Sequence, residues 1–112
     1  MTNRSRDKGT AWESSIVNYL QQAGWPHAER RARNGAHDRG DITGIPGVVV
    51  EAKNEKRVAL AEYITETETE KTNANAALGI CWIKRRGKSS AGDGYVLMSG
   101  SQLVELLKAA GY

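Results

Sequence analysis

The stretch from Asp41 to Lys53 constrains the fold of this chain more than any other, because it predicts a β-hairpin. Its two arms, residues 41–45 and 48–53, are rich in β-branched side chains, which favour extended strands. Between the arms stands Pro46-Gly47, a pair typical of a tight turn. We therefore expect a sheet with this hairpin at its middle.

The spacing of apolar residues predicts helices and further strands around the hairpin. One helix begins at Thr10, where Thr10-x-x-Glu13 has the form of a capping box, and ends before Gly24. Residues 58–77 are also interpreted as a helix. Thr and Glu alternate there as in an exposed strand, but apolar residues and three glutamates repeat at helical spacing. The other predicted elements are a strand or loop at 27–33, strands at 78–83 and 95–98, and a closing helix after Ser99.

This succession, α-β-β-β-α-β-β-α, predicts an α/β fold with a central mixed β-sheet and flanking helices. The chain has 112 residues, of which 39% are hydrophobic and 26% charged, and this balance suits one domain of ordinary size. We expect a flexible basic arm over residues 1–9 and a single domain over residues 10–112.

Two classes of protein are disfavoured by what the sequence lacks. No apolar run approaches the ~20 residues of a membrane span, so we do not expect a membrane protein. Cys81 is the only cysteine, which excludes an intrachain disulfide and a cysteine-rich zinc site. The first nine residues lack the apolar stretch of a secretory signal, and a cytoplasmic location is therefore expected.

Charge is sorted along the chain, although the net charge is only +3. Basic residues gather in three groups, while four glutamates fall within the predicted helix at 58–77. Such sorting predicts a basic face that binds nucleic-acid phosphates through counterion release, although a solvated surface explains any single group equally well. The candidate DNA contacts are Arg30, Arg31, Arg33, Asn34, His37 and Arg39 before the hairpin and Lys84, Arg85, Arg86 and Lys88 after residue 83; the third group is Arg4, Arg6 and Lys8, and the glutamates are Glu62, Glu66, Glu68 and Glu70.

Asp41, Glu51 and Lys53 are the residues of the hairpin that carry chemistry. A regular strand places Glu51 and Lys53 on one face. The loop decides whether Asp41 joins them. A two-residue turn sets Ile42 opposite Glu51, whereas a three-residue loop sets Asp41 there instead. The sequence leaves both registers open.

If the three side chains meet, the set predicts phosphodiester hydrolysis. Two carboxylates at close range repel each other, and a divalent cation between them relieves the repulsion. Mg²⁺ prefers oxygen ligands and is commonly held by one or two carboxylates together with substrate phosphates. Lys53 adds a positive charge where a phosphate under attack gains negative charge. The alternative is a solvated strand face on which Glu51 and Lys53 form an ordinary salt bridge.

The run Gly40-Asp41-Ile42, then Val48-Val49-Val50-Glu51-Ala52-Lys53-Asn54, resembles the restriction-endonuclease-like nuclease superfamily. Within it the likeness is greatest to the small Holliday junction resolvases of archaea and their phage-encoded relatives, and it spans residues 8–100. The resemblance implies that Asp41 and Glu51 are metal ligands and that Lys53 is the catalytic lysine.

Glu13 matches the acidic residue on the first helix of that superfamily, so the resemblance implies that Glu13 completes the metal site. The same residue is also the last of the capping box, and this second interpretation stays open. The chain departs from its relatives in the loop before the aspartate. Relatives often have a proline directly before the aspartate and a serine in the loop, where this chain has Gly40 and Asn34.

The resemblance further implies Mg²⁺ as cofactor with Mn²⁺ as a substitute, four-way DNA junctions as substrate, and a homodimer in the cytoplasm, or in the host cytoplasm if a phage encodes the chain. Two alternatives are kept: a nuclease of the same chemistry that acts on flaps, nicks or other DNA, such as mismatches or single strands, and a non-catalytic nucleic-acid-binding module. The candidate dimer contacts are Tyr63, Ile64 and Trp82, with Trp25 ranked behind them, unless these residues belong to the core.

Overall fold

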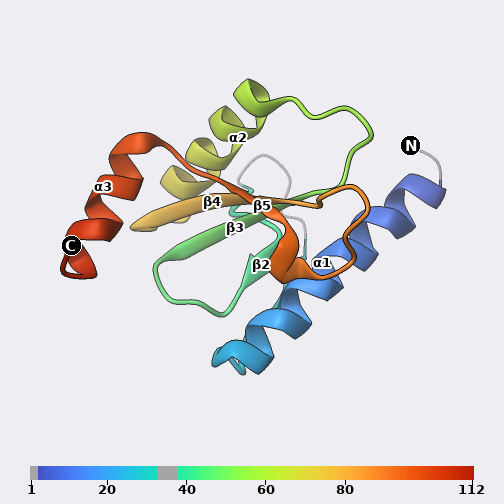
Figure 1. Cartoon of the computed structure of the whole chain (residues 1–112), viewed down its shortest axis with the longest axis horizontal. Coiled ribbons are helices and arrows are strands. Elements are labelled where there is room, and N and C mark those ends of the chain that lie inside the picture. Colours follow the sequence, from blue (N-terminus) through green and yellow to red (C-terminus); the bar gives the residue numbers. More distant parts are fainter. Residues whose placement is uncertain (1–2, 33–37) are drawn as a thin grey trace.

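A computed structural model describes residues 3–32 and 38–112 and shows an α/β fold with a five-stranded mixed sheet and three α-helices (Figure 1). The predicted order of helices and strands is confirmed. The elements are α1 (Asn3–Ala23), β1 (Glu29–Arg30), β2 (Ile42–Thr43), β3 (Val48–Lys53), α2 (Leu60–Asn73), β4 (Leu78–Ile83), the 3-10 turn η2 (Ala91–Asp93), β5 (Tyr95–Leu97) and α3 (Gly100–Ala109).

The strands lie in the order β1-β2-β3-β4-β5, so that β3, the second arm of the hairpin, is the central strand. Strands β3 and β4 are parallel, and all other neighbours are antiparallel. A parallel pair needs a long crossover, which α2 supplies here. The carboxyl ends of β3 and β4 therefore meet at the same edge of the sheet.

The hairpin has the register that a three-residue loop produces. Ile42 pairs with Val50, which sets Asp41 opposite Glu51. The loop closes with a hydrogen bond of 3.1 Å from the Val48 amide to the Ile45 carbonyl. Gly47 has a φ of 77°, a left-handed conformation that glycine adopts without strain. Of the two registers left open by the sequence, the structure has the one that brings Asp41 and Glu51 together.

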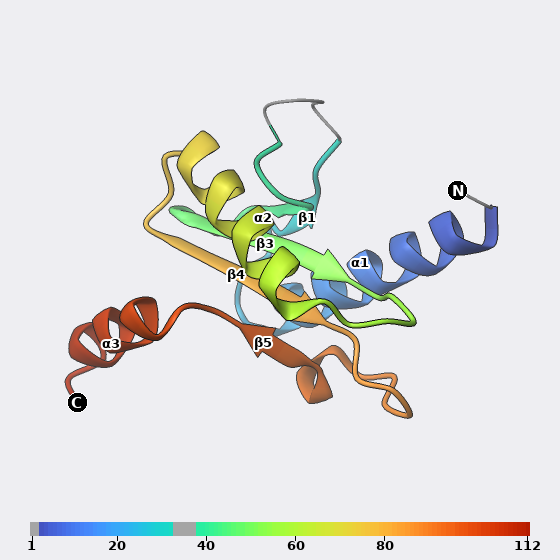
Figure 2. The same ribbon diagram turned by 90° about the horizontal axis from the view of Figure 1, so that it is seen from above.

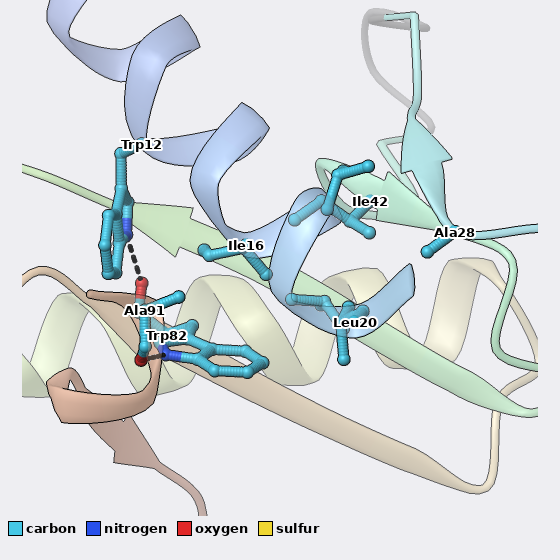
Figure 3. Close-up of a cluster of buried hydrophobic side chains, with 9 residues drawn as sticks. Trp12, Ile16, Leu20, Ala28, Ile42, Trp82 and Ala91 are labelled. Atoms are coloured by element: carbon cyan, nitrogen blue, oxygen red, sulfur yellow. Dashed lines mark hydrogen bonds between the residues drawn. The ribbon is translucent and has the colours of Figure 1, made fainter. Parts of the chain in front are cut away.

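Helix α1 covers one face of the sheet and builds the larger core (Figure 3). Trp12, Ile16 and Leu20 recur at helical spacing and pack against apolar side chains of the strands. The Trp12 indole donates a hydrogen bond of 3.1 Å to the Trp82 carbonyl, and the Trp82 indole donates one of 2.9 Å to the carbonyl of Ala91. Each buried indole thus keeps a polar partner.

Helix α2 covers the opposite face, as the alternation of side chains along β3 requires. Val50 packs on the α1 side, so its neighbour Glu51 points to the α2 side. There Glu51 lies beside Cys81, its partner on β4, and Cys81 packs with Tyr63 of α2. The buried Glu51 side chain therefore lies between the sheet and α2, the helix that lies over β3 and β4 in Figure 2.

The start of the first helix differs from the prediction. Helix α1 begins at Asn3, so the expected arm is wrong for residues 3–9, and Thr10 lies inside the helix and does not form the first cap. Arg and Lys have good helix propensity, and extending an existing helix costs little, which explains why this basic segment continues it. The predicted end before Gly24 is confirmed, with Gly24 at a φ of 122°.

Helix α3 is held by its first turn. The Ser99 hydroxyl accepts a hydrogen bond from the Gln102 amide, as a cap should. The Gln102 side chain does not complete a capping box; instead it exchanges two hydrogen bonds of 2.9 Å with the backbone of Gly79 on β4. Beyond the two hydrogen bonds of Gln102, helix α3 runs away from the sheet (Figure 2). Its apolar residues Leu103 and Val104 are about half exposed.

The structure shows which of the candidate dimer contacts are buried in the core and which are accessible. Tyr63 and Trp82 are buried in the core, so the prediction that they form an interface is wrong and the core alternative holds for both. Ile64 is half-buried and Trp25 is exposed. Within the ranges that the structure describes, no helix is both long and apolar enough to span a membrane.

Candidate active site

The end of β3 brings Asp41, Glu51 and Lys53 together. The register fixes Asp41 opposite Glu51, and one carboxylate oxygen of Asp41, Oδ2, accepts a hydrogen bond of 2.9 Å from the Ala52 amide. Lys53 lies on the same face two residues beyond Glu51, with its Nζ 3.9 Å from Glu51 Oε2. The local rule that places alternate residues on one face thus assembles two carboxylates and one ammonium.

Helix α2 adds two acidic residues that sequence reasoning missed. Glu66 Oε2 forms an ion pair of 2.9 Å with Lys53 Nζ. Oxygen atoms of Asp38, Glu51, Glu66 and Glu70 all lie within 4.8 Å of one another. Glu51 and Glu70 are each only 2% exposed, whereas the Glu66 side chain is 42% exposed and reaches solvent. The site is therefore a buried carboxylate cluster with one open side.

A signal for the α2 residues was present in the sequence. Glu66 and Glu70 are four residues apart and share a helix face with Tyr63 and Thr67, which are buried against the sheet. The sorting of charge along the sequence identifies these glutamates only as acids held apart from the basic groups. The structure adds that Glu66 and Glu70 lie beside Glu51 and Lys53 at the end of β3.

The buried carboxylates are poorly satisfied. Glu51 Oε1 and both carboxylate oxygens of Glu70 have no hydrogen-bond partner among the described residues. Burial, together with the neighbouring carboxyl groups of Asp41 and Glu66, raises the pKa of Glu51 far above its usual range. Burial raises the pKa of Glu70 to about 7. Such groups keep their negative charge at low cost only when a cation joins them.

Lys53 remains charged in this setting. Burial alone would lower the pKa of its ammonium group, but the hydrogen bond with Glu66 and the charge of Glu51 outweigh burial and raise it. The ammonium also lies 5.3 Å from the centre of the Tyr63 ring, where a cation is favoured. Lys53 therefore supplies a fixed positive charge at the open side of the cluster.

The structure does not bring Glu13 into this cluster. Glu13 belongs to α1, on the other face of the sheet, and its Oε1 accepts a hydrogen bond of 2.9 Å from Arg30 Nε. Arg30 is the partner of Ile42, whose side chain packs against α1, so the pair lies on the α1 side. The capping interpretation is also wrong, because the helix begins seven residues before Thr10.

The candidate DNA contacts occupy different surroundings. Arg33, Asn34 and His37 lie outside the described residues. Arg30 and Arg39 are exposed, and Arg31 is half-buried, with a buried Nε that has no hydrogen-bond partner among the described residues. In the group after β4 the Lys84 side chain donates to the Lys88 carbonyl, while the remaining side chains are exposed, namely those of Arg85, Arg86 and Lys88.

Basic residues gather at the edge of the sheet where β3 and β4 end. The Lys84 amide donates a hydrogen bond of 2.9 Å to the Lys53 carbonyl, which joins the basic group after β4 to the site. The Asn54 side chain bonds to the Lys8 carbonyl, which ties the first turns of α1 to the same edge. In Figures 1 and 2 the start of α1 and the connections after β3 and β4 lie on one side of the molecule. Sequence reasoning missed two exposed members of this edge, Lys56 and Arg57.

The carboxylate oxygens of this cluster suit a hard divalent cation. Carboxylate oxygens are the ligands that Mg²⁺, Mn²⁺ and Ca²⁺ prefer. The adjacent ammonium and the basic edge suit an anionic substrate. Comparisons of the chain with protein-family models, with curated proteins and with solved structures found no match.

Proposed function

We propose that this protein is a metal-dependent endodeoxyribonuclease that cuts branched DNA, with four-way junctions as its substrate. The observation that carries the proposal is the meeting of Asp41, Glu51 and Lys53 at the end of β3, with a buried Glu51 oxygen that lacks a partner among the described residues. We interpret the central hairpin, with α1 on one face and α2 on the other, as a restriction-endonuclease-like core.

The donor set fits a divalent cation. Asp41 and Glu51 would hold Mg²⁺, or Mn²⁺ in its place, through carboxylate oxygens. When bound, the ion lowers the pKa of a coordinated water and offsets negative charge on the phosphate. Lys53 directs its ammonium toward the same phosphate and stabilises the charge that develops there. The ion pair with Glu66 restricts the Lys53 side chain to this position.

DNA binding is assigned to the basic edge next to the site. Its side chains neutralise phosphates on either side of the bond that is cut, and binding is expected to weaken steeply with salt. A four-way junction has near two-fold symmetry, whereas this chain has one Asp41-Glu51-Lys53 set. We therefore propose a homodimer, which would supply two sites related by a two-fold axis.

A purely structural network of ion pairs explains the cluster less well. In such a network each buried carboxylate would have its own cation or hydrogen-bond donors. Lys53 supplies one positive charge, and both oxygens of Glu70 lack a partner among the described residues. The same geometry serves a nuclease that acts on flaps or nicks, so the DNA shape must be tested directly.

The test is to incubate labelled four-way junctions, flaps and linear duplexes with the protein and Mg²⁺, Mn²⁺ or EDTA. The proposal predicts paired, symmetric cuts in the junction that require the metal. Asp93→Asn, which changes an exposed aspartate in η2, serves as a matched control with unchanged cutting. Failure to cut any of these DNAs with either metal would overturn the proposal, and cuts in flaps alone would overturn the assignment of the junction.

A further inference from the structure

Three carboxyl groups of the cluster have no role in the chemistry assigned to the hairpin: Asp38, Glu66 and Glu70. They come from two segments, the loop before β2 and helix α2, that lie far apart in the sequence. Their oxygen atoms nevertheless lie within 4.8 Å of one another and of Glu51. Carboxylates at such distances repel one another, and either a retained proton or a bound cation relieves the repulsion.

Burial makes this more than a surface accumulation of acids. Only 2% of Glu70 is exposed to solvent, and both of its carboxylate oxygens lack a hydrogen-bond partner among the described residues. Glu51, equally buried, also has one such oxygen. A buried carboxylate normally accepts several hydrogen bonds, and a bound cation is one of the ligands that satisfies oxygens left without donors.

The loop that carries Asp38 is fixed against α2 by polar contacts. The Asn73 side chain at the end of α2 donates a hydrogen bond of 2.9 Å to the Asp38 carbonyl. The Gly40 amide donates one of 2.9 Å to Asp38 Oδ1. Gly40 itself has a φ of 99°, and a Cβ atom there would come within 2.9 Å of the Val49 side chain, so the close approach of this segment to β3 requires glycine.

We propose that Asp38, Glu66 and Glu70, together with Glu51, form a divalent-cation site whose ligands come mainly from outside the hairpin. All its donors are carboxylate oxygens, which select Mg²⁺, Mn²⁺ or Ca²⁺. Glu51 also belongs to the pair that it forms with Asp41. Two of the other proposed ligands, Glu66 and Glu70, come from α2, whereas Glu13 on α1 is not among them. Cation binding stands without DNA cleavage; only the use of this ion in cleavage rests on the proposed function.

The site also explains the contact between Glu66 and Lys53. Glu66 is the exposed member of the cluster and bonds to Lys53 through Oε2. A ligand that holds the cation and also contacts the lysine couples occupancy of the metal site to the position of the ammonium. Through Glu66, helix α2 thereby links the cation and the Lys53 ammonium, the two positive charges that a bound phosphate would contact.

The test is Mn²⁺ binding to the full chain without DNA, measured by isothermal titration calorimetry and by electron paramagnetic resonance. Glu70→Gln on α2 and Asp38→Asn on the loop are each expected to weaken Mn²⁺ binding at least ~10-fold, since even indirect partners of a metal matter by that much. Glu68→Gln, an exposed position on the same helix, is the control and should bind as the wild type does. Circular dichroism in EDTA verifies that each variant is folded.

Unchanged Mn²⁺ binding by folded Glu70→Gln and Asp38→Asn would overturn the α2 site. If Asp41→Asn then abolished Mn²⁺ binding, the cation would belong to the hairpin alone, and the proposed nuclease would stand without this site. If Glu70→Gln and Asp38→Asn weakened Mn²⁺ binding as expected but the wild type cut no DNA, the cation site would hold and the proposed function would fail.

Discussion

Replacing Glu70 by Gln should make the metal-free protein more stable at neutral and alkaline pH. The folded state keeps a proton on Glu70 up to about pH 7, because burial raises its pKa from 4.5 to about 7. The unfolded chain releases that proton near pH 4.5, so the stability of the wild type falls as pH rises between these values. Over this pH range the free energy of unfolding falls by ~3 kcal/mol.

The carboxyl groups of Asp38, Glu66 and Asp41 add to the cost of ionising Glu70, whereas Glu51 offsets part of that cost. Glutamine has nearly the same volume and carries no charge, so it removes this cost and can donate a hydrogen bond to a neighbouring carboxylate. In EDTA at pH 8, Glu70→Gln should therefore gain up to ~3 kcal/mol in the free energy of unfolding, and below ~0.5 kcal/mol near pH 4.5.

Urea unfolding followed by tryptophan fluorescence measures this difference, since Trp12 and Trp82 are buried. Glu68→Gln, exposed on the same helix, is the control and should change stability by less than about 0.5 kcal/mol at both pH values. At the same Mn²⁺ concentration the wild type should gain more stability than the Gln variant, because Mn²⁺ binding by the variant is expected to be at least ~10-fold weaker. A variant that is less stable than the wild type at pH 8 in EDTA, or that gains equally at both pH values, would show that ionised Glu70 does not destabilise the folded protein.

Two further outcomes are expected from the surroundings of the site. Gln102→Leu leaves the buried amide and carbonyl of Gly79 without their hydrogen-bond partners and should lower the free energy of unfolding by ~2–5 kcal/mol. Urea titration measures this loss, with Ser101→Ala as the control. A loss below ~0.5 kcal/mol would show that the two hydrogen bonds of Gln102 are dispensable. Cys81 is buried and burial raises its pKa to about 12, so a thiol reagent at pH 8 should label it only after unfolding in urea, and rapid labelling of the native protein would contradict its placement.

The order of elements and the hairpin could be predicted because both depend on local chemistry. β-branched runs, Pro46-Gly47 and apolar spacing each act within a few residues, and the structure has the strands and helices where these signals lie. The register needed one more fact, the loop length, which left-handed Gly47 settles in the structure. Asp41 could therefore be matched with Glu51 only as one of two alternatives.

The ligand contribution of α2 could not be predicted from spacing alone. Glu66 and Glu70 lie on the face of α2 that meets the sheet, but Glu62 and Glu68 belong to the same acidic run and are exposed. Which face is buried depends on how the helix crosses β3 and β4, a tertiary fact. Asp38 was assigned no role, because its distance from Glu70 depends on the same packing.

Glu13 illustrates the reverse error. The matching position on the first helix suggested a ligand, and Thr10 suggested a cap, but the helix begins at Asn3 and places Glu13 beside Arg30. The order of residues along the sequence is enough to match Glu13 to an acidic residue on the first helix of a known family. It does not reveal on which face of the sheet that residue lies. The acidic residues nearest Glu51 come from the opposite side, on α2.

Whether this site is the catalytic centre is tested most directly by cleavage of an end-labelled four-way junction by the wild type and by Asp41→Asn, with Mg²⁺ and with EDTA. We expect the wild type to cut only with Mg²⁺. We expect no cutting by the variant, which should still bind the junction as tightly or more tightly, because one carboxylate no longer repels the phosphate. Cutting by Asp41→Asn at the wild-type rate, or joint loss of cutting and binding, would contradict the claim that this site is the catalytic centre.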